Sequence, residues 1–351
     1  RSLNNLMALN AGAIRFNTDS SQMEIYDGNQ WTGIISSGPE IETGGTRMLF
    51  MGGTHASGSP HLSNKIEFVQ VETTGDVIDF GDLSNQKQEG AALGGPLRAL
   101  HFGGDTQNTD IEFVTFSSQG NSVDFGDPTQ ASKSGMGMAD RTRGLMILGF
   151  NAPGSSYSNV MNYVTLQTTG NAIDFGDVST SGCGAGAGID SPTRGIFALG
   201  TLTPGTYSNA IEYVNISTTG NGIDFGDLLS SGVHTVGYSN AVRGVFHSAY
   251  QYPASPNFMN IIQYITMSTF GNATDFGDSL LGGFGCGGAS QTRGVAGGGY
   301  SANAPTGESG GFTSIIDFVQ IMTTGNATDF GSLTESKRHL KGDSNGHGGV
   351  R

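Results

Sequence analysis

The sequence predicts an all-β protein, a six-bladed β-propeller that follows a short N-terminal β-hairpin. A segment of about fifty residues recurs six times, and a strand-rich repeat of this period without helical periodicity favours a propeller. Every copy carries the tripeptide Asp-Phe-Gly, with its phenylalanine at Phe80, Phe125, Phe175, Phe225, Phe276 and Phe330. One arginine per copy recurs at the same interval, at Arg47, Arg98, Arg143, Arg194, Arg243 and Arg293.

Each copy is expected to contain four antiparallel strands. In one copy, residues 194–200 form an apolar run that ends in glycine, which is typical of a strand covered on both faces. Residues 209–217 are rich in β-branched and aromatic residues, and residues 223–225 form the next strand after a tight turn at 218–221, where Gly and Asn tolerate positive φ. The fourth strand is rich in Gly and Ala, most clearly at 182–189. Because blades converge on an axis, we expect this small-residue strand innermost and the Asp-Phe-Gly strand outermost.

The two ends of the chain lie outside the six complete copies. Residues 1–44 precede the propeller, which is expected to span residues 45–351. Residues 337–349 resemble one more innermost strand, so we expect the C-terminus to complete the first blade beside Arg47. Within the N-terminal segment, residues 13–31 predict a hairpin with a polar turn at 19–22. A single hairpin is marginally stable alone, so we expect it to dock on the propeller, on copies of itself or on neighbouring proteins, through Phe16, Tyr26 and Trp31.

Composition excludes several classes of partner. The net charge is -14, with 16 basic and 30 acidic residues, which argues against nucleic acid or an anionic membrane as a partner. No apolar run approaches the ~18 residues of a membrane span. Cys183 and Cys286 fall in copies that are not neighbours, so free thiols are expected. The sequons at Asn215, Asn272 and Asn326 lie inside the repeat and are expected to be structural.

The paired aspartates of each copy, such as Asp174 with Asp177, are also expected to be structural. A catalytic pair is needed once in a cleft, whereas this pair recurs around the array. We expect Arg–Asp contacts or hydrogen bonds within turns, and calcium binding is the alternative, although no segment fits an EF-hand loop. The seven histidines show no metal-ligand spacing, and no catalytic or phosphate-binding motif stands out. We therefore expect no metal, no cofactor and no enzyme activity.

Two resemblances add to this interpretation. The expected strand order, with apolar strands that end in glycine pairs such as Gly52-Gly53 and Gly103-Gly104, resembles the kelch family over residues 46–349, with phenylalanine in place of the kelch tryptophan. The segment Gly-Ala-Ile-Arg-Phe-Asn-Thr-Asp and the repeated Thr-Thr-Gly-Asn-Ala-Ile-Asp-Phe-Gly-Asp are similar to fibre and virion proteins of tailed marine bacteriophages, including cyanophages. This resemblance implies a virion location and a structural or host-attachment role.

The loop between the second and third strand differs most between copies. Variable loops on a rigid scaffold commonly carry binding, and tyrosine offers a flat ring with a polar tip. The candidate binding face consists of Tyr157, Tyr207, Tyr250, Tyr252, Phe258 and Tyr300. Packing within the loops is the alternative role for these side chains.

The favoured function is a non-enzymatic tail-fibre or host-attachment component of a virion. Its expected partners are other virion proteins, further copies of itself in a homo-oligomer, and a glycan or protein of the host surface. The alternatives are a bacterial surface lectin or adhesin and a glycan-degrading propeller enzyme, because propellers host all three functions.

Overall fold

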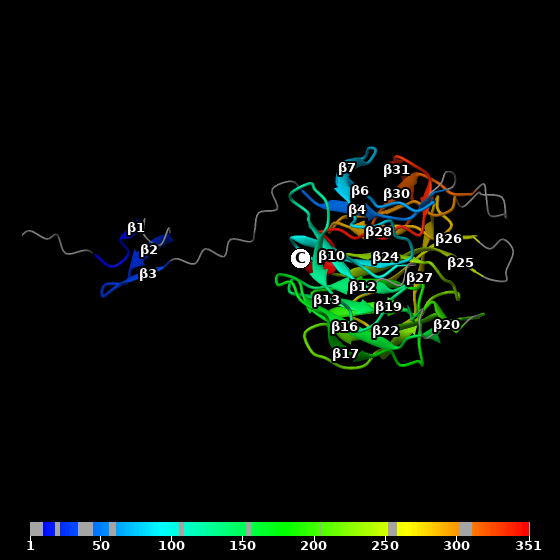
Figure 1. Cartoon of the computed structure of the whole chain (residues 1–351), viewed down its shortest axis with the longest axis horizontal. Helices are drawn as coiled ribbons and strands as arrows, with labels where there is room; N and C mark the ends of the chain where they lie inside the picture. Colours follow the sequence, from blue (N-terminus) through cyan, green and yellow to red (C-terminus); the bar gives the residue numbers. More distant parts are fainter. Residues whose placement is uncertain are drawn as a thin grey trace, which may run out of the picture. The chain divides into compact units, whose positions relative to one another are not determined.

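The computed structural model describes residues 10–17, 22–33, 45–55, 61–104, 109–151, 156–203, 205–251, 258–301 and 311–350. The chain divides into two compact units, residues 1–43 and 44–351. The described residues form strands and one 3-10 turn, η1 (Gly348–Val350), with no α-helix (Figure 1). None of them belongs to a helix that is long and apolar enough to cross a membrane.

The first unit contains a three-stranded antiparallel sheet, β1 (Ile14–Asn17), β2 (Gln22–Tyr26) and β3 (Trp31–Gly33). A hairpin was expected here, and the third strand was missed. The Asp27 carboxylate accepts hydrogen bonds from the backbone N–H groups of Asn29 and Gln30, both at 2.7 Å, and this turn separates β2 from β3. Trp31 therefore begins a strand of its own. The expected polar turn at 19–22 lies largely outside the described residues.

The second unit repeats one antiparallel sheet, and the strand order within each sheet is the order expected from the sequence. The small-residue strand comes first, then the arginine strand, then the aromatic strand, with the Asp-Phe-Gly strand at the opposite edge. Sheets two to six consist of β8 (Ala91–Gly94), β9 (Arg98–Phe102), β10 (Ile111–Thr115), β11 (Val123–Gly126); β12 (Met136–Ala139), β13 (Arg143–Ile147), β16 (Val160–Thr165), β17 (Ile173–Asp177); β18 (Ala187–Asp190), β19 (Arg194–Ala198), β22 (Ala210–Asn215), β23 (Ile223–Asp227); β24 (Val236–Ser239), β25 (Arg243–Tyr250), β26 (Phe258–Thr266), β27 (Thr274–Asp278); and β28 (Cys286–Ala289), β29 (Arg293–Gly297), β30 (Ile315–Gln320), β31 (Thr328–Ser332). Such sheets are consistent with propeller blades.

The first sheet draws on both ends of the second unit. It contains β4 (Arg47–Met51), β6 (Lys65–Gln70) and β7 (Ile78–Asp82). Residues 341–345 run antiparallel to β4, through backbone hydrogen bonds of Met51 with Lys341 and of Leu49 with Asp343. Further along, β32 (Lys337–Arg338) pairs with β5 (Thr54–His55). The C-terminal segment therefore lies where a fourth strand was expected, although only part of it is regular.

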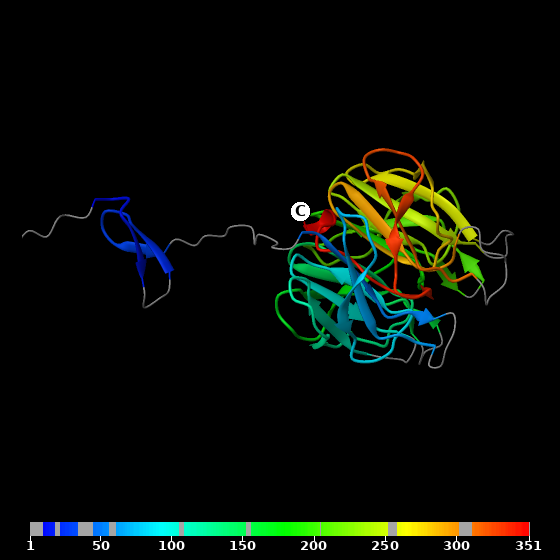
Figure 2. The same ribbon diagram turned by 90° about the horizontal axis from the view of Figure 1, so that it is seen from above.

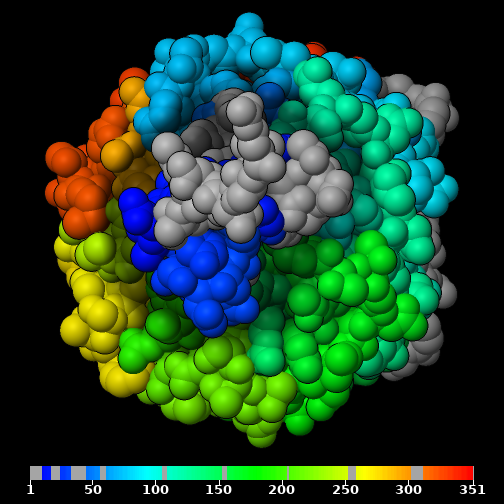
Figure 3. All heavy atoms as spheres, turned by 90° about the vertical axis from the view of Figure 1, so that its left-hand side faces the viewer, coloured from blue at the N-terminus to red at the C-terminus, as the bar shows by residue number. Residues whose placement is uncertain are grey.

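Successive sheets are packed face to face, and a hydrophobic core lies between each pair. Five cores join sheets that follow one another in the chain, and a sixth joins the first sheet to the last through side chains such as Phe50 and Phe330. Two short two-stranded ribbons, β14 (Phe150–Asn151) with β15 (Ser156–Tyr157) and β20 (Thr201–Thr203) with β21 (Thr206–Tyr207), extend the third and fourth sheets. The outer parts of the second unit follow one another in sequence order around the view in Figure 3, and Figure 2 gives the arrangement from above.

The Asp-Phe-Gly element joins each sheet to the next. Its phenylalanine is at most 3% exposed, and the phenylalanine carbonyl accepts a hydrogen bond of 2.7–2.9 Å from a glycine N–H in the following sheet, as Phe175 does from Gly220. The motif glycine has φ of +144° to +155°, and a side chain there would clash, since a Cβ on Gly176 would lie 2.5 Å from the Gly220 carbonyl oxygen. Both facts favour glycine.

The glycine that donates to the phenylalanine carbonyl, such as Gly220, is followed by a residue that completes the junction. At five junctions this residue is an asparagine. Its side-chain oxygen accepts a hydrogen bond of 3.0–3.1 Å from the backbone N–H of the residue after Phe-Gly in the preceding sheet. At the junction between the last sheet and the first, the Asp76 carboxylate accepts the corresponding hydrogen bond from the Ser332 N–H. Asn272 and Asn326 are two of these asparagines, which confirms a structural role for them. Cys183 and Cys286 are buried and free, as expected.

The repeated arginines are structural, but their partners differ from those expected. Each guanidinium lies over the ring of the aromatic residue in the neighbouring strand, at 4.1–5.2 Å from the ring centroid, as Arg194 does over Tyr213. Each also donates to a backbone carbonyl in the next sheet, as Arg194 does to Met267 at 3.1 Å. The expected Arg–Asp contacts were wrong for the described residues, because the first aspartate of each motif, such as Asp224, points to solvent.

A buried polar residue next to a β-bulge supplies a further junction in every sheet. The register shifts at the same place between the third and fourth strand of each sheet, beside Glu67, Glu112, Asn162, Glu212, Gln263 and Asp317. Each of these side chains accepts a hydrogen bond from a backbone N–H in the turn that follows the preceding sheet's Asp-Phe-Gly strand. The bulge re-aims the side chain into this position.

Candidate functional site

Six residues with left-handed backbone form a ring of hydrogen bonds across the second unit. We call this set the left-handed ring; it consists of Glu89, Ser134, Ala185, His234, Phe284 and His339, with φ of 52–67°. Each residue lies just before or within a small-residue strand segment, one per sheet. Each backbone N–H donates to the carbonyl of the member in the preceding sheet at 2.5–3.1 Å, and Glu89 donates to His339. The hydrogen bonds therefore return to the residue where they began.

The side chains of the left-handed ring form an aromatic group on one side. His234 stacks on Phe284, with ring centroids 4.0 Å apart and an interplanar angle of 20°. His339 stands edge-on to both rings, at 5.0 Å from His234 and 4.9 Å from Phe284. Burial, with the nearby Arg338 and Lys341, holds the pKa of His339 well below its usual value. Burial, with His339 and Lys341, does the same to the pKa of His234. Both imidazoles are therefore neutral at pH 7.

The opposite side of the left-handed ring is polar. The Glu89 carboxylate lies 3.2 Å from the Lys133 ammonium and 3.2 Å from Nδ1 of His339. The Ser134 hydroxyl donates to Glu89 at 3.3 Å. Neutral imidazoles, a carboxylate and a hydroxyl offer both donors and acceptors beside an aromatic face.

Three of the residues expected to bind meet in one aromatic cluster beside Phe284. Phe258 stacks on Tyr300 at 4.5 Å and lies 5.5 Å from Tyr250, while Tyr250 and Tyr300 each approach Phe284 to 5.2 Å. The cluster continues through Phe312, 5.4 Å from Tyr300. Tyr300 is only 4% exposed, so it supports the cluster from within.

The other three candidates lie elsewhere or are not described. Tyr157 packs edge-on against Phe150 at 5.3 Å, and burial raises the pKa of its hydroxyl. Tyr207 belongs to β21 and pairs with Thr201, in the ribbon next to Tyr157. Neither joins the cluster around Phe284. Tyr252 lies outside the described residues.

A cavity of about 70 Å³ lies next to the left-handed ring. Residues that directly follow ring members line it, among them Gly135, Gly186, Thr235 and Gly285. The Lys341 side chain lines it too, and no hydrogen bond or ion pair reaches its ammonium group from the described part of the chain. Burial lowers the pKa of Lys341, an effect that Cys286 and Glu89 offset only in part. The small inner residues leave room for the Lys341 ammonium, which no described carboxylate contacts directly.

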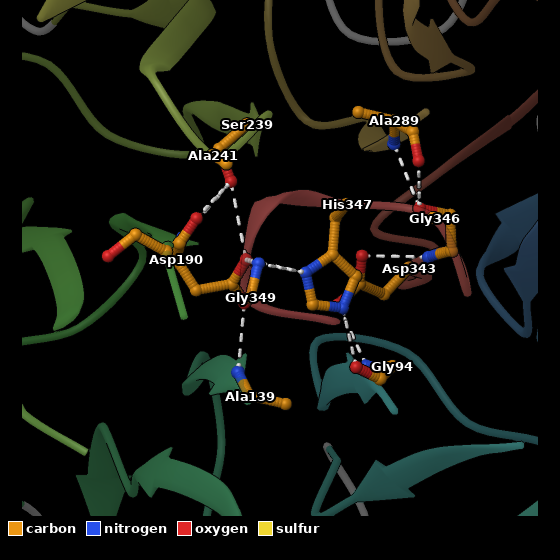
Figure 4. A network of polar contacts seen from close by, with 12 residues as sticks. Gly94, Ala139, Asp190, Ser239, Ala241, Ala289, Asp343, Gly346, His347 and Gly349 are labelled. Atoms are coloured by element: carbon orange, nitrogen blue, oxygen red, sulfur yellow. Dashed lines mark hydrogen bonds and ion pairs between the residues drawn. The ribbon is translucent and has the colours of Figure 1, made fainter. Parts of the chain in front are cut away.

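The C-terminal segment borders the same cavity through a network centred on His347 (Figure 4). Nδ1 of His347 lies 2.6 Å from the Asp190 carboxylate, and Nε2 lies 2.5 Å from the carbonyl oxygen of Gly94. Burial opposes the charge of His347, but the carboxylates of Asp190 and Asp343 outweigh it and raise its pKa to about 10. Asp343 accepts a hydrogen bond from the Gly94 N–H at 2.8 Å, and burial raises its pKa to about 6. Residues of three distant sheets meet here.

The Asp190, Asp343 and His347 side chains carry metal-ligand atoms within 4.8 Å of one another. Their hydrogen bonds argue against a cation. Nε2 of His347 faces a carbonyl oxygen, which only accepts, so this nitrogen must carry a proton. Nδ1 lies 2.6 Å from the Asp190 carboxylate, and the Gly349 N–H also approaches it at 3.2 Å, so protein groups already engage both ring nitrogens. The network therefore holds the C-terminal segment in place.

The left-handed ring was missed from the sequence, although one signal was present. In the repeats the position holds Glu, Ser, Ala, His, Phe and His, whereas the position after it holds glycine in four of the six copies. Phe284 stands between Gly283 and Gly285, an unusual place for a large side chain in a small-residue strand. A left-handed conformation cannot be read from such a pattern.

The expected assembly residues of the first unit lie on two faces of its sheet. Directly paired residues share a face, so Phe16 lies with Ile14 and Ile25, and these three are 57%, 59% and 37% exposed. Tyr26 and Trp31 pack together on the opposite face, with ring centroids 5.4 Å apart. Phe16 therefore does not share a face with Tyr26 and Trp31.

No protein-family model matches this chain, and no curated protein matches it at a significant level.

Proposed function

We propose that the second unit is a closed six-bladed β-propeller of kelch-like type. Four sets of bonds support closure: the Asp-Phe-Gly junctions, the arginine–carbonyl bonds, the bulge bonds and the left-handed ring. Each set links every sheet to the next and also links the sixth sheet to the first, through Gly75 with Phe330, Arg293 with Glu72, Thr334 with Glu67, and His339 with Phe284. A closed array leaves no sheet face uncovered.

The function that these features support best is that of a virion appendage part that attaches to a host surface. The observation that carries this proposal is the contrast between repeated and unrepeated positions. Repeated side chains are used in contacts between sheets, whereas unrelated side chains occupy the six positions of the left-handed ring, beside the Tyr250 and Phe258 cluster. A rigid scaffold that presents varied side chains at one place is suited to recognition.

The first unit supports the assembly half of the proposal. Its small sheet leaves Ile14, Phe16 and Ile25 exposed together on one face, which is typical of an interaction surface. We propose that this face, called the apolar face below, mounts the chain on other virion proteins or on further copies in a homo-oligomer. The resemblance of both parts of the sequence to phage virion proteins favours the same assignment, with the virion as its location.

Particle incorporation tests the proposal. A tagged chain is supplied to assembling particles, which are then purified on a density gradient. The native chain is expected to sediment with particles, and an Ile14→Ser, Phe16→Ser double variant is expected to stay free while its second unit melts normally. Gln30→Ser, an exposed turn residue of the same unit, is the control. A native chain that stays free of particles would contradict the proposal, and glycan release by the chain would favour the enzyme alternative.

A further inference from the structure

We propose that the left-handed ring, with Lys341 beneath it, binds an anionic sugar, whose ring lies against Phe284 and whose acidic group approaches Lys341. This inference rests on the proposed attachment function and names the class of receptor. It concerns a site distinct from the loop tyrosines that the sequence indicated.

Backbone strain is the first argument for a site at this position. A left-handed conformation is strained for a residue with a side chain, and glycine avoids this strain. The chain has 58 glycines, yet all six members of the left-handed ring carry a side chain. Among described residues other than glycine, only Ser248 shares this conformation outside the ring. Side chains kept at six strained positions point to a use for them.

Charge is the second argument, and it selects an anionic ligand. Besides burial, three cationic side chains lower the pKa of His339, namely those of Arg338, Lys341 and Lys133. Among the described residues, Glu89 is the carboxylate that contacts His339. The chain as a whole has 30 acidic and 16 basic residues, so a cationic group of side chains is unusual here. Lys133 pairs with Glu89, and Arg338 donates to the Tyr300 hydroxyl, which leaves the Lys341 ammonium without a counter-charge in the described part of the chain.

The negative charges of the same cavity are already engaged. Asp343 accepts hydrogen bonds from the backbone of Gly94 and Ser344. Asp190 is neutralised by His347 at 2.6 Å. Lys341 is partly buried, and charges withdrawn from water are normally paired, so an anionic group supplied by a ligand completes the arrangement around Lys341.

The aromatic side of the ring favours a sugar over a bare anion. The stacked Phe284 and His234 present an aromatic face of the kind that packs against the apolar face of a sugar ring. Both are half-buried, so part of each ring remains accessible. The neutral His234 and the Ser134 hydroxyl supply donors and acceptors for sugar hydroxyl groups.

Titration calorimetry on the full chain tests this inference. The probes are a uronic-acid hexasaccharide, a sulfated hexasaccharide and a neutral glucose hexasaccharide. The native chain is expected to bind at least one acidic probe at least tenfold more tightly than the neutral one, and the two acidic probes distinguish carboxylate from sulfate. Lys341→Met and Phe284→Ala should each weaken binding at least about tenfold, which is typical of anchor residues. Arg15→Gln removes the same charge from the first unit and should change affinity less than twofold.

Thermal melting keeps the test informative. Lys341→Met removes a partly buried charge that no described carboxylate contacts, so its melting temperature should equal or exceed that of the native chain. Preference for the neutral probe, no binding of either acidic probe, or unchanged affinity in a folded Lys341→Met variant would overturn the inference. The attachment proposal would stand in those cases if the chain still bound host cells, and a native chain that binds no cells would contradict the attachment proposal itself.

Discussion

The backbone N–H of Gly75 donates a hydrogen bond to the carbonyl oxygen of Phe330 at 2.9 Å, which joins the first sheet of the repeat to the last. The same bond occurs at the other five junctions, between residues adjacent in the repeat order. The contact therefore depends on a single motif, used six times. Changes at one junction should affect stability without touching the candidate site.

Removing one repeated arginine should weaken one junction. Arg194→Ala loses the contacts of the guanidinium with Tyr213 and Phe270 and its hydrogen bond to the Met267 carbonyl. We expect the free energy of unfolding to fall by about 1–3 kcal/mol. The free energy of unfolding of Arg194→Lys should lie between those of the native chain and Arg194→Ala, because lysine keeps the charge but not the planar group. Denaturant unfolding measures both variants, and an unchanged midpoint in Arg194→Ala would contradict a structural role.

Two glycines of the third sheet, which serve neighbouring junctions, separate the effect of crowding from that of backbone conformation. Gly176 and Gly170 have φ of +144° and +157°, but a Cβ would meet the Gly220 carbonyl only at Gly176, since nothing lies within 4 Å of Gly170. Gly176→Ala should therefore be less stable than Gly170→Ala by about 1–3 kcal/mol, the usual cost of overpacking. Denaturant unfolding measures both variants. Equal losses of free energy of unfolding in Gly176→Ala and Gly170→Ala would contradict the close packing of Gly176 against the Gly220 carbonyl.

The His347 network predicts a defined loss of stability in alkali. The pKa of His347 is raised on folding from 6.5 to about 10, so its contribution is complete below pH 6.5 and is lost as the pH rises through 10. The melting temperature of the native chain should decrease as the pH rises from 7 to 10.5. The His347→Gln variant should have a lower melting temperature at pH 7, and that temperature should stay constant over the same pH range. His61→Gln, an exposed histidine, is the control. Asp343 titrates from 3.8 to about 6, outside this window. A parallel fall in His347→Gln would place the titrating group elsewhere.

Much of the fold could be predicted because each strand has its own residue pattern. Gly and Ala mark the strand where sheets crowd together, as Gly188 shows, with no room for a side chain against the Gly137 carbonyl. The aromatic and Asp-Phe-Gly strands follow in the expected order. The third strand of the first unit was missed, although the Asp27-Gly28-Asn29 turn signal precedes it.

The partners of side chains were harder to predict than the strands. Equal spacing of Arg194 and Asp224 suggested a charge pair, but a guanidinium is satisfied equally by an aromatic face and a carbonyl, which leave no pattern of their own in the sequence. The left-handed ring depends on backbone conformation at six separate positions. It also depends on the approach of segments about fifty residues apart, and this requires the fold to be known.

Competition for host cells tests the central claim most directly, namely that this protein attaches a particle to a host surface through the left-handed ring. Purified native chain is added to host cells before the particles, and the fraction of particles adsorbed is counted. The account predicts that native chain lowers adsorption in a dose-dependent way. It also predicts that a folded Phe284→Ala, Tyr250→Ala double variant lowers adsorption far less, with Arg15→Gln equal to native. Native chain without effect, or a double variant that blocks adsorption as well as native, would contradict the account.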